Sequence, residues 1–267
     1  MALVLARSKR IRKRLHRTFY PYYRATAALR PLPNSVIIGG MKCGTTTLNA
    51  WLRSHPEVAF SAIKEIHFFD QNYEKGSDWY RSFFPIWERL LGAKCVLEAT
   101  PAYLFRASVV AERMHRLVPE ARLIVMLRDP VKRAISHYGH RVRNGEEDRS
   151  IEEALLSDYG RAVGSDNSYK TRGLYADQIQ TFRKFYAEHQ IMVIKSEDFF
   201  AKPEPIYAAV LNFLGVSQRP LPEGSSPRNV GQRQAEIPVE VTEHLSQYYQ
   251  APNQRLAELL PSFSVWP

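Results

Sequence analysis

A nine-residue run, GGMKCGTTT at 39–47, combines glycines, a lysine and hydroxyl side chains. Glycines let a loop turn its backbone amides inward, and a helix that starts after such a loop adds positive potential at the same place. Lys42 supplies a point charge, and the hydroxyls of Thr45 and Thr46 can donate hydrogen bonds. The pattern indicates a phosphate-binding loop, although a glycine turn with an incidental lysine is the structural alternative. The expected ligand-binding residues are Lys42, Cys43, Gly44, Thr45, Thr46 and Thr47.

The spacing within this loop differs from that of a Walker A loop. In a Walker A loop the lysine directly precedes the Ser or Thr that holds magnesium. Here Cys43 and Gly44 separate Lys42 from Thr45, and Arg128 rather than an acidic residue follows the apolar run at 122–127. Both features disfavour a magnesium-dependent P-loop nucleotide kinase, which we keep as an alternative enzyme class. We expect no metal ion in the site.

A second set of phosphate-binding residues is expected after the run at 122–127. Arg128 stands at the carboxyl end of a predicted strand, the edge at which open α/β sheets bind ligands. Ser136 lies eight residues later, about two helical turns along the helix predicted to follow. On sequence alone Ser136 is also compatible with an ordinary helix serine. Separate sites for two phosphates suit a nucleotide that is phosphorylated at both ends of its ribose.

These two segments together resemble the motifs of a known family. The loop at 39–48 and the segment at 128–138 are similar to the 5′- and 3′-phosphate motifs of sulfotransferases that use 3′-phosphoadenosine 5′-phosphosulfate (PAPS). The resemblance implies transfer of a sulfuryl group from PAPS to an acceptor hydroxyl or amine. It also implies that Lys42 stabilises the departing 5′-phosphate, whereas Arg128 and Ser136 bind the 3′-phosphate.

Further segments resemble the heparan sulfate sulfotransferase group in particular. KEIHFFD at 64–70 is similar to its acidic catalytic motif, and the segment at 72–80 is similar to the N-sulfotransferases. EATPAY at 98–103 and the closing Trp266 resemble the 3-O-sulfotransferases. The similarity covers about 35–266 and favours a carbohydrate acceptor, with other small hydroxyl-bearing molecules left open.

The resemblance assigns roles to the motif at 64–70. Glu65 carries over as the general base, and His67 and Asp70 carry over as residues that line the acceptor site. Apolar neighbours such as Ile66 would partly desolvate the Glu65 carboxyl group and raise its pKa. A surface glutamate beside Lys64 is the alternative from sequence alone.

Three features depart from, or match only loosely, the pattern of the resembling family. Gly231 and Arg233 lie where the family has a loop that contacts the nucleotide, but the flanking residues match loosely. Ala99 stands where many 3-O-sulfotransferases have a lysine, which weakens heparan sulfate itself as the expected acceptor. The chain has two cysteines, and the family's C-terminal disulfide is absent. Reduced thiols favour a cytoplasmic location.

The charge of the chain is concentrated near its beginning. The chain has 267 residues and a net charge of +10, and nine Lys and Arg with no acidic residue fall within the first thirty. We predict a basic N-terminal arm at 1–33 and a sulfotransferase domain at 34–267. The arm is compatible with a solvated leader, a peripheral membrane contact or a guide for an acidic substrate. A basic module that binds nucleic acid or membrane is the non-enzymatic alternative; we expect no nucleic-acid partner. Since no apolar run is long enough to span a bilayer, we expect a soluble protein.

The elements that must position these residues alternate along the chain. Short apolar, β-branched runs predict strands at 35–39, 58–60, 94–98, 122–127 and 191–194. Periodic or capped segments predict helices at 45–53, 109–117, 130–143, 175–188, 205–214, 239–249 and 253–260. Ser150 and Glu153 have the spacing of a capping box. The alternation predicts an α/β fold, a P-loop-like parallel sheet with helices on both faces.

Overall fold

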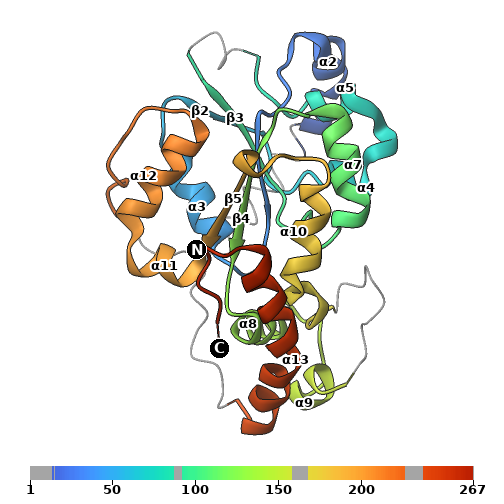
Figure 1. The fold of residues 1–267 in the computed structure, drawn as a ribbon. Coiled ribbons are helices and arrows are strands. Elements are labelled where there is room, and N and C mark those ends of the chain that lie inside the picture. The colour runs from blue at the N-terminus through green and yellow to red at the C-terminus, as the bar shows by residue number, and fades with distance from the viewer. Residues whose placement is uncertain (1–13, 15, 87–91, 158–167, 226–236, 267) are drawn as a thin grey trace.

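The protein has a five-stranded parallel sheet of order β2-β3-β1-β4-β5, which confirms the predicted α/β class (Figure 1). The computed structural model describes residues 14, 16–86, 92–157, 168–225 and 237–266. The strands are β1 (Ser35–Gly39), β2 (Val58–Phe60), β3 (Cys95–Ala99), β4 (Arg122–Leu127) and β5 (Ile191–Lys195). Since β1 and β4 are neighbours in the middle of the sheet, the segments that follow them start side by side at its carboxyl edge.

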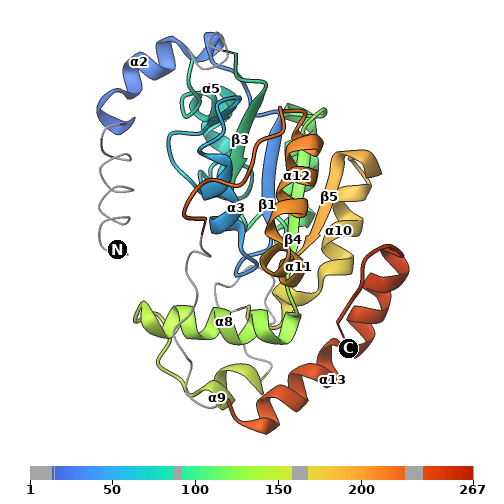
Figure 2. The same ribbon diagram turned by 90° about the vertical axis from the view of Figure 1, so that its left-hand side faces the viewer.

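Helices cover both faces of the sheet (Figures 1 and 2). One face carries α4 (Phe68–Gln71), α7 (Ala107–Leu117) and α10 (Tyr175–Arg183), and the other carries α3 (Thr45–Leu52), α11 (Ser196–Ala201) and α12 (Pro203–Leu214). Successive residues of β1 enter different cores: Val36 and Ile38 pack toward the first face and Ile37 toward the second. Side chains alternate along a strand, so a strand covered on both faces is apolar throughout.

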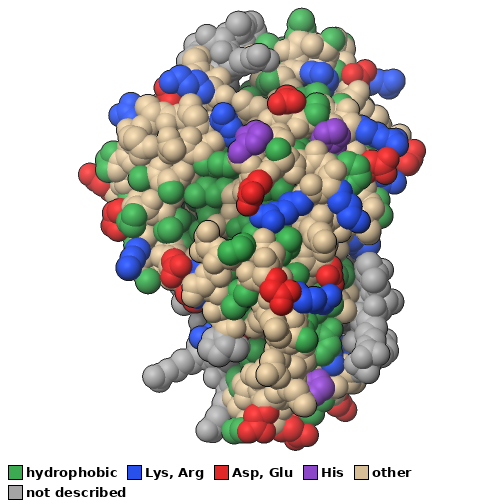
Figure 3. Space-filling view, viewed as in Figure 1, with side chains coloured by type: hydrophobic (Ala, Val, Ile, Leu, Met, Phe, Trp, Pro, Cys, Tyr) green, Lys and Arg blue, Asp and Glu red, His purple; other side chains and the backbone are tan. Residues whose placement is uncertain are grey.

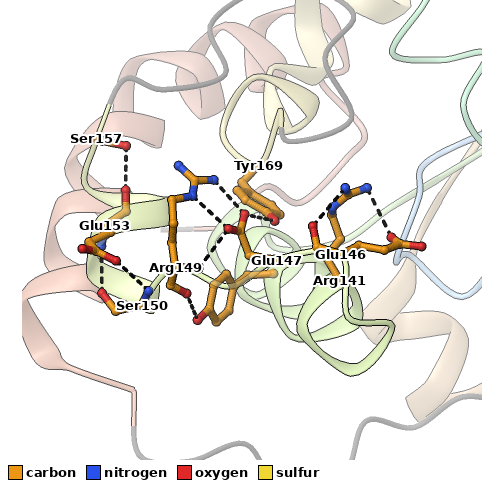
Figure 4. Close-up of polar contacts among 9 residues, drawn as sticks. Arg141, Glu146, Glu147, Arg149, Ser150, Glu153, Ser157 and Tyr169 are labelled. Atoms are coloured by element: carbon orange, nitrogen blue, oxygen red, sulfur yellow. Dashed lines mark hydrogen bonds and ion pairs between the residues drawn. The ribbon is translucent and has the colours of Figure 1, made fainter.

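Three further helices lie beyond the carboxyl edge of the sheet: α8 (Pro130–Arg143), α9 (Ile151–Leu155) and α13 (Val239–Leu259). A polar network ties the connection between α8 and α9 together (Figure 4). The Glu147 carboxylate accepts hydrogen bonds from Arg149 Nη2 at 2.7 Å and from the Tyr169 hydroxyl at 2.7 Å. The hydrogen bond from Arg149 is the main cause that lowers the Glu147 pKa to about 2. Ser150 and Glu153 form the predicted capping box at the start of α9.

Three helix predictions were wrong about where a helix ends or continues. The helix predicted at 175–188 ends at Arg183, because the amides that follow bond three residues back, as from Phe185 N to Phe182 O at 3.0 Å, and tighten the end. The two short helices predicted at 239–249 and 253–260 form the single helix α13, with Pro252 inside it. Buried side chains on both sides of Pro252, including Tyr249 and Leu256, hold the two halves on one surface, and this packing outweighs the lost amide.

The described part of the basic arm packs on the rest of the protein. Its helix α2 (Tyr20–Ala25) lies beside α5 (Gly76–Arg81) in both views (Figures 1 and 2). The His16 ring stacks on Phe83 with 3.9 Å between ring centroids, and its Nε2 lies 3.0 Å from Ser82 Oγ. None of the described helices combines the length and apolar character needed to cross a bilayer. The boundary between residues 33 and 34 stays a prediction.

The side of the molecule seen in Figure 1 has charges of both signs. Lys and Arg side chains lie among Asp and Glu side chains across it (Figure 3). The net charge of +10 is therefore not expressed as a single positive patch on this face.

Candidate active site

The loop between β1 and α3 has the turn that its glycines predict. Gly44 precedes α3 with φ +93°, and a Cβ built there would lie 3.0 Å from the Phe200 ring. A residue with a side chain would be strained in this left-handed conformation. Gly40 N donates to Met126 O at 2.7 Å, and Ser196 Oγ donates to Cys43 O at 2.6 Å. Hydrogen bonds thus attach the loop to β4 and to α11, and the loop leads directly into the amino end of α3.

Basic side chains from separate elements gather beside this loop. Lys42 is half-buried, and burial lowers its pKa to about 8, assisted by Arg143, Arg128 and Lys64. Arg128 Nη1 lies 3.5 Å from Lys42 O. Each cation disfavours the charge of the others, and an anionic ligand would relieve that repulsion. The cluster is suited to bind phosphate.

Residues of α8 complete this basic cluster. Sequence reasoning placed Ser136 here, and the structure has it half-buried on α8. It missed His140 and Arg143, which follow Ser136 by four and seven residues and so share its side of the helix. Burial lowers the His140 pKa, and the Lys42 charge lowers it further. Helical spacing from Ser136 was the signal that could have found both residues.

The other predicted loop residues contribute in different ways. The Cys43 side chain is buried, and burial raises the pKa of its thiol to about 11, so that it stays protonated. The Thr45 and Thr47 side chains are also buried. The amides of Cys43 and Thr47 donate to Gly40 O at 3.2 Å and Gly44 O at 2.9 Å. The amides of Cys43 and Thr47 are thus already engaged. The loop groups best placed for a phosphate are the Lys42 ammonium and the amides of Thr45 and Thr46 at the start of α3.

Glu65 and His67 both have left-handed backbone conformations, with φ 62° and 55°. Such angles are rare for residues other than glycine and are typical of functional sites. Glu65 N donates to Ala99 O at 2.9 Å, which holds this turn at the end of β3. The Glu65 side chain keeps 35% of its surface exposed. Ile66 instead points into the core, so the desolvation expected from it does not come from direct cover of the carboxylate.

One lysine connects Glu65 to the phosphate loop. Lys64 Nζ lies 3.5 Å from Glu65 Oε1 and donates to Thr46 Oγ1 at 2.9 Å. Thr46 is in the first turn of α3, immediately after Gly44. The Glu65 carboxylate and the phosphate loop therefore both contact the same ammonium group.

His67 and Asp70, both expected to line the acceptor site, also pair with each other in the structure. His67 Nδ1 lies 3.0 Å from Asp70 Oδ2, and the Asp70 side chain is 2% exposed. A buried carboxylate bound to one ring nitrogen orients the ring and favours a proton on that nitrogen. Nε2 is then the ring nitrogen that can meet a ligand.

A buried acid that sequence reasoning did not assign holds this segment in place. Glu98, fully buried in β3, accepts hydrogen bonds from the hydroxyls of Tyr80 at 2.7 Å, Thr100 at 2.5 Å and Tyr103 at 3.1 Å. Burial raises its pKa, and these donors partly oppose that effect. The Tyr103 hydroxyl also accepts from Phe68 N at 2.9 Å. Glu98 and Tyr103 thus connect the start of α4 to the sheet by hydrogen bonds. The sequence feature that could have indicated this role is a charged residue within an otherwise apolar strand.

A cavity of about 400 Å³ lies next to Glu65 and His67. Residues after the motif line one side of it, including Asn72, Lys75 and Trp79. Residues of the arm line another: His16, Arg17 and Tyr20. Glu65 therefore contacts the lysine that reaches the phosphate loop and also lines a cavity large enough for a small molecule.

The structure brings Lys42, Arg128, Glu65, His67 and Asp70 into one region. Gly231 and Arg233 lie outside the described residues. Within the described ranges, no group of three or more His, Cys, Asp or Glu side chains is arranged to hold a metal ion.

Comparison with known families identifies the class of protein. The model of the sulfotransferase domain family matches residues 32–246, and the chain belongs to that family. It is therefore a sulfotransferase with an α/β fold, and neither a nucleotide kinase nor a purely binding module.

Individual relatives include the heparan sulfate group. The chain is 29% identical over 260 residues to human heparan sulfate glucosamine 3-O-sulfotransferase 6, covering 89% of this chain and 74% of that protein. It is 33% identical over 195 residues to mouse heparan sulfate glucosamine 3-O-sulfotransferase 3B1, covering 72% and 48%. The membrane-associated sulfotransferase kil1 of Dictyostelium discoideum is 26% identical over 316 residues, covering 88% and 66%. The chain thus spans about half to three quarters of the length of these relatives.

A solved structure agrees with the fold. A sulfotransferase from Alicyclobacillus acidocaldarius is 30% identical and superimposes with a TM-score of 0.73. The superposition covers 86% of this chain and 96% of the other. The sulfotransferase domain of the Synechococcus PCC 7002 olefin synthase, at 16% identity and a TM-score of 0.50, shares the fold alone.

Proposed function

We propose that this sulfotransferase moves the sulfuryl group of PAPS to a hydroxyl or amine of a small or carbohydrate acceptor, with Glu65 as general base. The observation that carries the proposal is the bridge at Lys64. Its Nζ contacts Thr46 Oγ1 of the phosphate loop at 2.9 Å and Glu65 Oε1 at 3.5 Å. Donor and base are thereby within reach of one transferred group.

The basic cluster fits the two phosphates of the donor. Lys42 and the amides at the start of α3 would hold the 5′-phosphate, next to the positive end of the helix. Arg128 and Ser136 would bind the 3′-phosphate. Arg143 would add positive charge to this site, since it lies close enough to help lower the Lys42 pKa. Gly231 and Arg233 remain proposed contacts to the nucleotide.

The chemical step needs one base and one stabilised leaving group. An acceptor oxygen in the cavity attacks sulfur and forms a new S–O bond, while the S–O bond to the 5′-phosphate breaks. The acceptor proton passes to the Glu65 carboxylate. The Lys42 ammonium offsets the negative charge that develops on the leaving phosphate oxygen. His67, oriented by Asp70, accepts at Nε2 a hydrogen bond from a hydroxyl of the acceptor and so holds it.

Carbohydrate is the acceptor class that the relatives favour. Several carry heparan sulfate glucosamine in their names. The cavity offers the Trp79 ring and the Asn72 amide, groups that suit the apolar face and the hydroxyls of a sugar. Ala99, which is buried at the end of β3, has an uncharged methyl side chain and therefore offers no cation to an acidic acceptor. We further propose a cytoplasmic site of action, because both cysteines are free and buried.

Nucleotide binding and transfer are measured separately to test this proposal. Full-length protein is titrated with 3′-phosphoadenosine 5′-phosphate (PAP) in the presence of EDTA, and radiolabelled PAPS is incubated with a set of glycans and phenols. We expect PAP to bind without metal. Glu65→Gln should lower transfer by roughly 10²–10⁴-fold, the usual contribution of a general base, while the Kd for PAP changes less than about twofold.

Glu74→Gln is the matched control, because Glu74 is an exposed glutamate of the same region. It should transfer at the wild-type rate. Undiminished transfer by Glu65→Gln would remove Glu65 from the role of base. Absence of PAP binding by the wild type would contradict the donor assignment.

A further inference from the structure

The basic arm contributes a wall of the cavity beside Glu65. His16, Arg17 and Tyr20 line that cavity together with Glu65 and His67. These arm residues precede the region matched by the family model, which begins at residue 32. The cavity that would receive the acceptor is therefore bounded in part by a segment that precedes the region matched by the family model.

The arm is held in this position at both ends of its described part. Near its start, His16 is buried, stacked on Phe83 and bonded to Ser82. Near its end, Arg30 Nη1 donates to Phe84 O at 2.6 Å, and Arg81 Nη1 donates to Arg30 O at 2.6 Å. Contacts at two points separated by a helix fix the orientation of the segment between them.

The cavity wall presents two cations away from the basic cluster. Arg17 is exposed and comes from the arm, whereas Lys75 is exposed and comes from the segment before α5. Lys75 Nζ lies 4.6 Å from the centre of the Trp79 ring, so that the ammonium group stays beside the cavity. A ligand that reaches from Glu65 along this wall would meet positive charge on both of its sides.

We infer that the arm is part of the acceptor site and that Arg17, with Lys75, selects acceptors that carry an anionic group. The inference rests on the proposed function, since it takes the cavity beside Glu65 as the acceptor site. The role of the arm is then to discriminate among acceptors. The reacting groups, Glu65 and Lys42, lie outside it.

The test compares two arginines of the arm. Arg17 lines the cavity, whereas Arg24 is an exposed residue of α2 that does not line it. Wild type, Arg17→Ala and Arg24→Ala, each as the full chain saturated with PAP, are titrated with a heparin-derived hexasaccharide and with neutral maltohexaose. Tryptophan fluorescence reports binding because Trp79 lines the cavity. The Kd for PAP is measured for each variant.

We expect Arg17→Ala to weaken hexasaccharide binding about fivefold, the upper range for one exposed ion pair, and Arg24→Ala to weaken it less than about twofold. Lys75→Ala should behave like Arg17→Ala. Equal losses in the two arginine variants would show that the arm acts only as a basic tail and would overturn the inference. Failure of the wild type to prefer the anionic over the neutral oligosaccharide would overturn it as well.

Failure of the proposed function has a different signature. In that case the wild type would not bind PAP, or would transfer no label from PAPS to any acceptor, whatever the arginine variants do. A normal Kd for PAP together with identical hexasaccharide binding in all variants would reject the role of the arm and leave the donor site intact.

Discussion

The proposed donor side and the proposed acceptor side of Glu65 are built in different ways. The donor side is centred on one continuous β1–loop–α3 unit, and the neighbouring strand β4 adds Arg128 at the same edge of the sheet. The acceptor side is assembled from the arm, the turn at 63–67 and the segment around α5. A site centred on one short unit depends more on local sequence, whereas a site assembled from several distant segments changes whenever one of them is replaced. The same donor chemistry can thus be combined with different acceptors.

Removal of the Lys42 charge should have the largest effect, and it should act on the donor side. We expect Lys42→Ala to lower transfer about 10²–10³-fold, because a charge aimed at the developing anion is lost from a half-buried site. Transfer of label from PAPS and the Kd for PAP measure it. Lys184→Ala, at an exposed lysine after α10, serves as the control. A similar loss in both variants would show that general positive charge, rather than this position, supports transfer.

The second prediction concerns the Tyr103 hydroxyl, which connects the proposed acceptor side to the sheet. Tyr103→Phe removes the hydroxyl that joins Phe68 N to the buried Glu98. We expect the free energy of unfolding to fall by about 1–3 kcal/mol, because two buried polar groups lose a partner. Urea denaturation measures this change, with Tyr22→Phe at an exposed ring as the control. Equal stability of Tyr103→Phe and wild type would contradict the role of this hydroxyl.

The donor side should respond to alkaline pH through Lys42. Its pKa is lowered to about 8, so in the free protein the charge is lost as the pH rises through that value, whereas bound phosphate keeps the lysine protonated. Affinity for PAP should therefore fall by no more than about twofold between pH 7 and 8 and by up to about tenfold per pH unit well above pH 8. Calorimetric titration from pH 7 to 9.5 measures the slope. In Lys42→Ala this slope should disappear; its persistence would assign it to another group.

The attachment of the arm should show the smallest effect. Burial lowers the pKa of His16 below its ordinary 6.5, so the undocked arm binds more protons, and docking weakens as the pH falls below that value. His16→Ala should also remove the stacking on Phe83, worth about 0.5–1.5 kcal/mol. Faster hydrogen exchange at 76–84 measures both changes. His189→Ala, at an exposed histidine, should leave exchange there unchanged.

Local sequence was sufficient to predict the sheet and the position of the glycine loop that follows β1. The five strand predictions and the start of α3 are confirmed because apolar runs and glycine turns act over neighbouring residues. Lys42 and Arg128 could be placed together because both follow strands of one parallel sheet. The extent of α10 and the continuity of α13 could not be predicted, because packing against other elements decides where those helices end.

The sequence by itself determined the family and the class of enzyme, and it singled out Lys42, Arg128 and Glu65 as the residues that we propose for the chemistry. Only the tertiary structure decided that Lys64 bridges Thr46 and Glu65, that Glu98 supports the turn, and that His16 brings the arm to the cavity. The physical reason is the separation along the chain. His16 and Ser82 are 66 residues apart, and no periodic pattern or motif links residues that meet only when separate helices pack together.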